Sequence, residues 1–114
     1  MKLNEEKFKL AVLIKKFILD SENLLLNVPK KDYYNRDRFR DDITDILYSV
    51  YLANNTKSKD KRLEMQEEIL ARLSMIDFYL ERAYLYKYIS ENKLHIFSSR
   101  LEVIIKVVKA WIKS

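Results

Sequence analysis

The stretch LHIFSSRLEVIIKVVKAWIKS, from Leu94 to Ser114, repeats large apolar side chains at spacings of three and four residues. The repeat consists of Leu94, Phe97, Leu101, Ile104, Val108 and Trp111. This spacing places all six side chains along one side of an α-helix, as in the buried seam of a helical bundle. It predicts that the last segment of the chain is an amphipathic helix packed against other helices.

The same stretch carries a second apolar series, turned away from the first because each one-residue offset rotates a side chain by about 100°. A wide core face in a small bundle is one interpretation of it. The other is a subunit interface, since monomers rarely leave large apolar patches exposed. We predict a homo-oligomer whose interface combines this series with exposed positions on the preceding helix. The predicted interface residues are Ile96, Val103, Val107, Ala110, Met75, Phe78 and Leu85.

The composition points to helices throughout. The 114 residues contain no glycine, no cysteine and one proline, and 34% of them are charged. Tight β-hairpin turns favour glycine or Asn-Gly pairs, which this chain lacks. We therefore predict an all-α protein.

Three further helices follow from the 3.6-residue period, at about Asn4–Asn27, Asp37–Ala53 and Lys59–Ile89. Ser58 and Ser90 are the expected N-caps of the last two helices. Short connectors between such helices predict one domain, residues 1–114, folded as an antiparallel up-down-up-down four-helix bundle.

Two connectors carry more specific expectations. Pro29 ends the first helix, because the residue before a proline is driven out of the helical region. Residues 30–35, KKDYYN, are interpreted as a connector in which Asp32 or Asn35 caps the next helix. The pair Asn54-Asn55 is expected to end the second helix in the left-handed conformation.

The net charge of +5 is unevenly distributed. Residues 83–114 hold six basic side chains, against only Glu91 and Glu102 as acids. This excess indicates an anionic partner for the C-terminal part of the chain, whereas a lysine face that serves solubility is the alternative.

The residues that catalysis needs are scarce. His95 is the only histidine, so a zinc site built on a histidine pair is excluded, and His95 is expected at the surface. The Asp41, Asp42 and Asp45 cluster neighbours three arginines and is interpreted as a set of salt-bridge partners rather than a metal site. Without glycine there is no phosphate-binding loop or dinucleotide fingerprint. We predict a non-enzymatic protein with no metal and no cofactor.

The chain also contains eight tyrosines. Most are expected to cover an edge of the core with the hydroxyl in water. Tyr84, Tyr86 and Tyr88, which surround Lys87, are the candidates for stacking on unpaired bases.

Three stretches resemble a known family. They are the Pro29-Lys30 connector with the arginine-bearing start of the second helix, AYLYKYIS at residues 83–90, and AWIKS at residues 110–114. In order and spacing they resemble the Avd proteins, the accessory variability determinants of diversity-generating retroelements. More distantly they are similar to the bundle proteins encoded in intervening sequences of bacterial ribosomal RNA genes.

The resemblance implies a basic, cytoplasmic bacterial four-helix bundle that assembles as a ring-like pentamer. Such a protein binds nucleic acid and the element's reverse transcriptase, and so supports mutagenic copying of a template repeat. Asp77 and Glu81 stand where the family often has arginines, with Arg82 displaced by one position. The family's basic surface is therefore expected to be relocated or weakened here.

The predicted nucleic-acid contacts are lysines and arginines that reach backbone phosphates, which gives low sequence specificity. They are Arg36, Arg38, Arg40, Arg72, Arg82, Lys87, Lys93, Arg100, Lys106 and Lys109. One alternative is a bundle of the intervening-sequence type, which binds RNA without a reverse transcriptase. Another is a purely structural oligomer. No apolar run is long enough for a signal peptide or a membrane span, so a cytoplasmic protein without a membrane partner is expected.

Overall fold

The computed structural model describes residues 3–114 and is built from helices, with no strand in that range. The four long helices are α1 (Lys9–Leu24), α2 (Tyr33–Asn54), α3 (Lys59–Leu85) and α4 (Glu91–Lys113). Short 3-10 turns occupy Leu3–Glu5, Leu25–Asn27 and Lys30–Asp32. The prediction of an all-α protein is confirmed.

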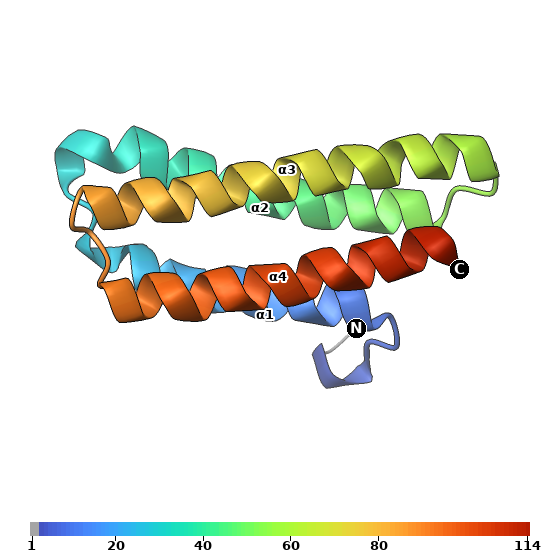
Figure 1. Ribbon diagram of the computed structural model, residues 1–114, viewed down its shortest axis with the longest axis horizontal. Coiled ribbons are helices and arrows are strands. Elements are labelled where there is room, and N and C mark those ends of the chain that lie inside the picture. The colour runs from blue at the N-terminus through green and yellow to red at the C-terminus, as the bar shows by residue number, and fades with distance from the viewer. Residues whose placement is uncertain (1–2) are drawn as a thin grey trace.

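The helices pack in contact as a bundle of two layers, α2 with α3 and α1 with α4 (Figure 1). Across the layers, α1 also contacts α2, and α3 also contacts α4. The α2–α3 connection lies at the right-hand end in Figure 1 and the α3–α4 connection at the left-hand end. The start of α2 and the end of α3 therefore meet at the left-hand end.

The core lies between the layers and contains the predicted seam of the last helix. Phe97, Leu101, Ile104 and Val108 are buried, and Leu94 and Trp111 pack against this core from its edge. Burying such side chains stabilises the fold by about 1.5–3 kcal/mol each.

The first helix begins at Lys9 rather than near Asn4, so the predicted start is wrong. The chain turns before α1 because the Glu6 carboxylate is held by three donors. It accepts hydrogen bonds from the Tyr51 hydroxyl at 2.9 Å, the Lys15 ammonium at 3.3 Å and the backbone N–H of Phe8 at 3.3 Å. Sequence periodicity does not reveal such tertiary bonds.

The second helix begins at Tyr33, so the interpretation of residues 30–35 as a connector is also wrong. Residues 30–32 form a 3-10 turn that leads directly into α2. The Asp32 side chain makes no capping bond, because it accepts hydrogen bonds from Asn35 and from Tyr88 of the distant α3–α4 connection. Asn35 lies inside the helix.

The third helix ends at Leu85, four residues before the predicted Ile89. The backbone N–H of Tyr88 reaches the Ala83 carbonyl at 2.8 Å, and the N–H of Lys87 reaches the Tyr84 carbonyl at 2.9 Å. These are the two bonds of a Schellman motif, in which the residue after the cap is left-handed. Lys87 takes that position with φ 65°, where glycine is usual.

Other expectations about the helix ends had mixed outcomes. Ile89, the predicted last residue of the third helix, follows the turn instead and is buried. Asn55 has φ −95° and is not left-handed. The two serine caps are confirmed, with the Ser58 hydroxyl accepting from Lys61 N–H and the Ser90 hydroxyl accepting from Lys93 N–H.

Candidate nucleic-acid interface

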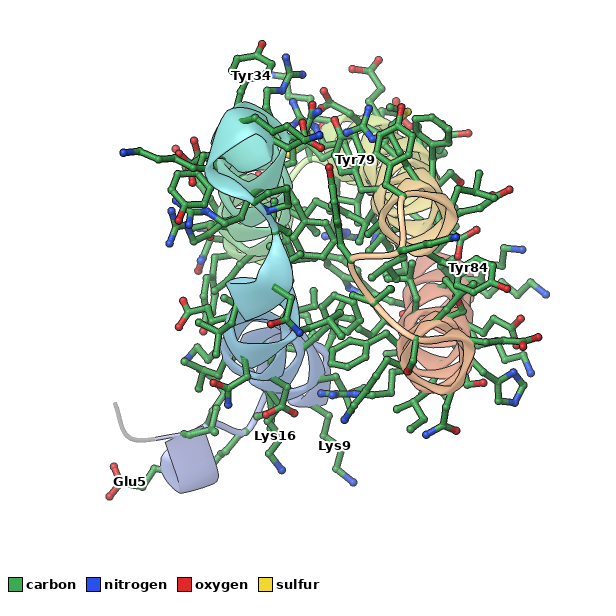
Figure 2. The ribbon with its side chains drawn as sticks, turned by 90° about the vertical axis from the view of Figure 1, so that its left-hand side faces the viewer. Glu5, Lys9, Lys16, Tyr34, Tyr79 and Tyr84 are labelled. Carbon is green, nitrogen blue, oxygen red and sulfur yellow. The ribbon has the colours of Figure 1, made fainter. Side chains whose placement is uncertain are left out.

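The ten predicted contact residues do not share one surface. Five gather where α2 begins and α3 ends, while Arg72 lies within α3 and the rest lie on α4. The five are Arg36, Arg38, Arg40, Arg82 and Lys87. Figure 2 looks onto this end of the bundle. We call it the aromatic–arginine end, and it comprises Tyr33, Tyr34, Arg36, Arg38, Arg40, Tyr79, Arg82, Tyr86, Lys87 and Tyr88.

On α2, two tyrosines each lie beside an arginine one helical turn further on. The Arg36 guanidinium lies 3.7 Å from the centre of the Tyr33 ring. The Arg38 guanidinium lies 5.9 Å from the Tyr34 ring centre and donates a 3.1 Å hydrogen bond to its hydroxyl oxygen. Residues three or four apart face each other on a helix, so the early start of α2 creates both pairs.

On α3, Arg82 has the same relation to two rings. Its guanidinium lies 5.4 Å from the Phe78 ring centre and 5.2 Å from that of Tyr79. The Tyr79 side chain points between α2 and α3 in Figure 2, and its hydroxyl donates to the Asp42 carboxylate of α2 at 2.8 Å. Burial, together with this bond to Asp42, raises the pKa of Tyr79. Tyr79 thus fixes the two helices to each other.

The α3–α4 connection adds two more rings. The Tyr88 hydroxyl donates to one Asp32 oxygen at 2.8 Å, while the Asn35 amide donates to the other at 2.6 Å. The bond to Asp32, followed by burial, raises the pKa of Tyr88. Tyr86 packs edge-on against Tyr88, with 5.8 Å between ring centres. The exposed Tyr86 ring therefore packs against the Tyr88 ring, which is held in place by Asp32.

The hollow between Phe39, Tyr79, Arg82 and Tyr88 has a volume of about 30 Å³. That volume holds a water molecule or two, whereas ligand pockets in proteins span about 300–1,000 Å³. A second, open hollow of about 360 Å³ is lined by Tyr33, Arg36 and Arg40 together with Leu25 and Leu26. A partner would therefore meet the outer surface of this end and this open hollow, not the small cavity.

The arginines at this end differ in how far a carboxylate already neutralises them. Asp37 accepts from Arg36 at 3.1 Å and from Arg40 at 2.8 Å. Among residues 3–114, no carboxylate oxygen lies within 4.0 Å of a nitrogen of Arg38, Arg82 or Lys87. These three are the cations left for an external anion. The predicted ion pairs with Asp41, Asp42 and Asp45 are absent, because Asp37 takes their place.

The remaining predicted contacts are engaged or lie apart. Arg72 pairs with Glu68 at 3.4 Å, and Arg100 pairs with Asp20 at 2.9 Å. Lys93 lines a separate hollow beside Asp20 and Arg100, between α1 and α4. Lys106 and Lys109 are exposed along α4. The structure does not bring these five together with the aromatic–arginine end.

The three tyrosines predicted to stack on bases do not all lie together. Tyr86 and Tyr88 belong to the aromatic–arginine end, but Tyr84 lies at the side formed by α3 and α4, away from Tyr34 and Tyr79 (Figure 2). Tyr33 and Tyr34 were missed because their segment was assigned to a connector. The available signal was an arginine three or four residues after each tyrosine. His95 is exposed, as predicted.

The predicted interface residues of α4 lie on the side of that helix that faces α1. Arg100 marks this side, because it pairs with Asp20 of α1. Ile96, Val103 and Val107 lie four, three and seven residues from Arg100, which places them on the same side. Ile96, Val103 and Ala110 are exposed, whereas Val107 is half-buried against the core. We call these four residues the α4 face.

The predicted interface residues of α3 lie on a different side of the bundle. Arg82 marks it, since it contacts Tyr79, whose hydroxyl reaches α2. Met75, Phe78 and Leu85 lie seven, four and three residues from Arg82 and are exposed. We call these three residues the α3 face. Contact between α3 and α4, marked by Ser98 and Asp77 at 3.4 Å, separates it from the α4 face.

The described residues 3–114 contain neither a cluster of metal ligands nor a membrane-spanning helix. No three acidic or histidine side chains gather there as metal ligands would. None of the helices in this range combines the length and the apolar character needed to cross a membrane.

Comparisons with models of known protein families, with curated proteins and with solved structures found no match to this chain.

Proposed function

We propose that this protein is a non-enzymatic accessory protein of a diversity-generating retroelement, which binds RNA or DNA and the element's reverse transcriptase. One observation carries the nucleic-acid part: predicted contacts from α2, α3 and the α3–α4 connection meet at one end among exposed aromatic rings. Arg38 and Arg82 there have no carboxylate partner within the described residues 3–114. The link to a retroelement rests on the family resemblance of the sequence.

A single subunit offers few phosphate contacts at this end. Arg38, Arg82 and Lys87 together would give a slope of about −3 for the logarithm of the association constant against that of the salt concentration. So small a number of contacts binds weakly, and linking several subunits multiplies the strength of binding without new kinds of contact. Assembly and nucleic-acid binding therefore belong to the same proposal.

We propose that the subunits assemble head to tail, with the α3 face of one copy against the α4 face of the next. Support comes from the position of the two apolar faces on different sides of the bundle. A head-to-tail contact whose rotation closes gives a ring, and the family resemblance suggests five subunits. Each subunit would be an up-down-up-down antiparallel bundle, in keeping with connections at alternate ends (Figure 1).

The nucleic-acid proposal is tested by titrating a labelled 30-nucleotide RNA in gel shifts from low to high salt. The wild-type protein should retard the RNA at low salt and release it as the salt concentration rises. Replacing Arg38 and Arg82 together by alanine should flatten the salt slope by about 2. Arg72→Ala, which removes an arginine already paired with Glu68, is the matched control. No retarded species at low salt would exclude the proposal.

The assembly is tested by light scattering of two single variants, Val103→Glu and Met75→Glu. About half of each side chain is exposed, so a buried charge at a subunit contact should release folded monomers from either face. Leu52→Glu, which puts the same charge at an exposed apolar position of α2 outside both faces, should keep the mass of the wild-type assembly. An unchanged mass in both test variants would contradict the head-to-tail contact.

The reverse-transcriptase partner is tested by the genes next to this one and by co-purification. A neighbouring reverse transcriptase gene with paired template and variable repeats should be present, and its product should co-purify with this protein. Nucleic-acid binding without either would instead favour the intervening-sequence type of bundle.

A further inference from the structure

The exposed rings of the aromatic–arginine end are not needed to cover the core. Tyr34 is 69% exposed and Tyr86 is 54% exposed. By contrast, Tyr79 and Tyr88 are half-buried, with their hydroxyls bound to Asp42 and Asp32. The end therefore has an anchored inner pair of rings and an outward pair that stabilises the fold little.

Each outward ring is held in place while its surface stays available. The hydroxyl of Tyr34 accepts a bond from Arg38, whose guanidinium stands 5.9 Å from the ring centre, near the outer limit of a cation–π contact, while the Tyr34 residue stays 69% exposed. Tyr86 rests edge-on against Tyr88 at an interplanar angle of 72°. Rings fixed in this way lose little entropy when a planar group stacks on them.

The cations stand next to the rings, and none of them has a carboxylate oxygen within 4.0 Å in the part of the chain from residue 3 to residue 114. Arg38 adjoins Tyr34, Lys87 adjoins Tyr86 in the chain, and Arg82 lies over Phe78. A planar base stacked on a ring would place its phosphate near one of these cations. Alternating rings and cations are what proteins use to bind single strands, whose base faces are open. A duplex hides its base faces and offers mainly phosphates to such a surface.

We infer that the aromatic–arginine end binds unpaired nucleic acid in preference to duplex, by stacking bases on Tyr34 and Tyr86 beside Arg38 and Lys87. The inference rests on the proposed nucleic-acid function and adds the strand state that it selects. Because every base has an aromatic face, the preference is for single strands and not for a sequence.

The test measures fluorescence anisotropy with three labelled probes: a 12-nucleotide oligouridine, the matching oligothymidine and a 12-base-pair duplex. The wild-type protein should bind both single strands more tightly than the duplex. Tyr34→Ala and Tyr86→Ala should each weaken single-strand binding by about 5-fold or more, the lower bound for one stacked base. Duplex binding should stay within about twofold. Comparable losses with oligouridine and oligothymidine would show that the ring contacts do not depend on the sugar.

Two control variants separate stacking from other effects. Tyr34→Phe keeps the ring and loses the hydroxyl that Arg38 holds, so it should bind single strands less tightly than the wild type but more tightly than Tyr34→Ala. Tyr48→Ala removes a 59% exposed tyrosine from α2 that lies outside the aromatic–arginine end and should change nothing. Circular dichroism confirms that each variant is folded.

Three results would overturn the inference. Equal affinity for single strands and duplex, with both alanine variants neutral, would refute stacking while leaving the nucleic-acid function intact. Loss of duplex and single-strand binding in equal measure would assign the tyrosines to structure. Binding of none of the three probes at low salt would refute the proposed function and the inference together.

Discussion

Two clusters at opposite ends of the bundle use the same chemistry with different results. At the end where α1 begins, Tyr51 donates to Glu6, and Lys15 lies 5.5 Å from the Tyr51 ring centre. At the aromatic–arginine end, Tyr79 and Tyr88 donate to Asp42 and Asp32. Both clusters therefore combine phenols, carboxylates and cations.

The difference lies in what remains unsatisfied. The Glu6 side chain is 9% exposed, and the neighbouring cation, Lys15, forms a salt bridge with it. At the aromatic–arginine end, Arg38 and Arg82 lack a carboxylate partner among residues 3–114, and the rings of Tyr34 and Tyr86 are more than half exposed. A cluster that satisfies its own charges serves the fold, whereas one that leaves cations beside open rings can also serve a partner.

The strongest test of this contrast compares an inner ring with an outer one. Tyr79→Ala should lower the free energy of unfolding by about 2–3 kcal/mol, because it removes packing against Phe39 and leaves Asp42 without its donor. Tyr34→Ala should change it by less than about 0.5 kcal/mol, as exposed positions do. Urea unfolding followed by circular dichroism measures both. Equal losses would show that the outer ring is structural.

A smaller effect is expected at the closed cluster, and it depends on pH. The hydrogen bond from Tyr51 is the main cause that lowers the pKa of Glu6 from its ordinary value of 4.5. A lowered folded-state pKa gives stability that is complete above the unfolded value and is lost as pH falls through the folded value. Glu6→Gln should therefore lower the Tm at pH 7.

The same comparison repeated between pH 7 and pH 2 checks the sign. The gap in Tm between wild type and Glu6→Gln should narrow as the pH falls below about 4.5, because the wild-type carboxyl is then protonated as well. Nucleic-acid binding at pH 7 should be the same in both proteins. A gap that stays constant with pH would show that Glu6 acts through packing and not through its charge.

The smallest expected effect separates backbone from charge at Lys87. Lys87→Gly removes the energetic cost of a non-glycine residue in the left-handed conformation, but glycine also has more conformational freedom in the unfolded chain. The net result should be an increase of about 0.5–1 kcal/mol in the free energy of unfolding. The substitution also removes one cation, so the salt slope of binding should fall by about 1. Lys87→Ala should show the same decrease in the salt slope of binding, without the gain in the free energy of unfolding. A stability gain in both variants would contradict the backbone explanation.

Local sequence pattern predicted the features that depend on neighbours in the chain. The seam from Phe97 to Val108 and the caps at Ser58 and Ser90 follow from periodicity and from single side chains. The start of α1 was not predicted, because it depends on the hydrogen bond between Glu6 and Tyr51, which is 45 residues away. The start of α2 failed for a similar reason, since Asp32 bonds to Tyr88 and does not cap.

The candidate site shows the same division. Sequence pattern and the family resemblance identified Arg38 and Arg82 as candidate contacts. They did not show which arginines are already neutralised, because that depends on side-chain rotamers. Arg40, for example, pairs with Asp37 and not with Asp41. Tyr34 was missed because a wrongly placed helix start hid its spacing from Arg38. The separation of the α3 face from the α4 face depends on how the helices pack, which no spacing within one helix contains.

Trp111 packs edge-on against Phe8, with ring centres 5.5 Å apart, so its intrinsic fluorescence is sensitive to this contact. Trp111 is the only tryptophan, and it lies at the end of the bundle away from the aromatic–arginine end. Its emission therefore reports whether the segment before α1 stays docked on the end of α4. Release of that segment by acid should change the emission before the helices melt, and a ligand stacked on Tyr34 should leave it unaltered.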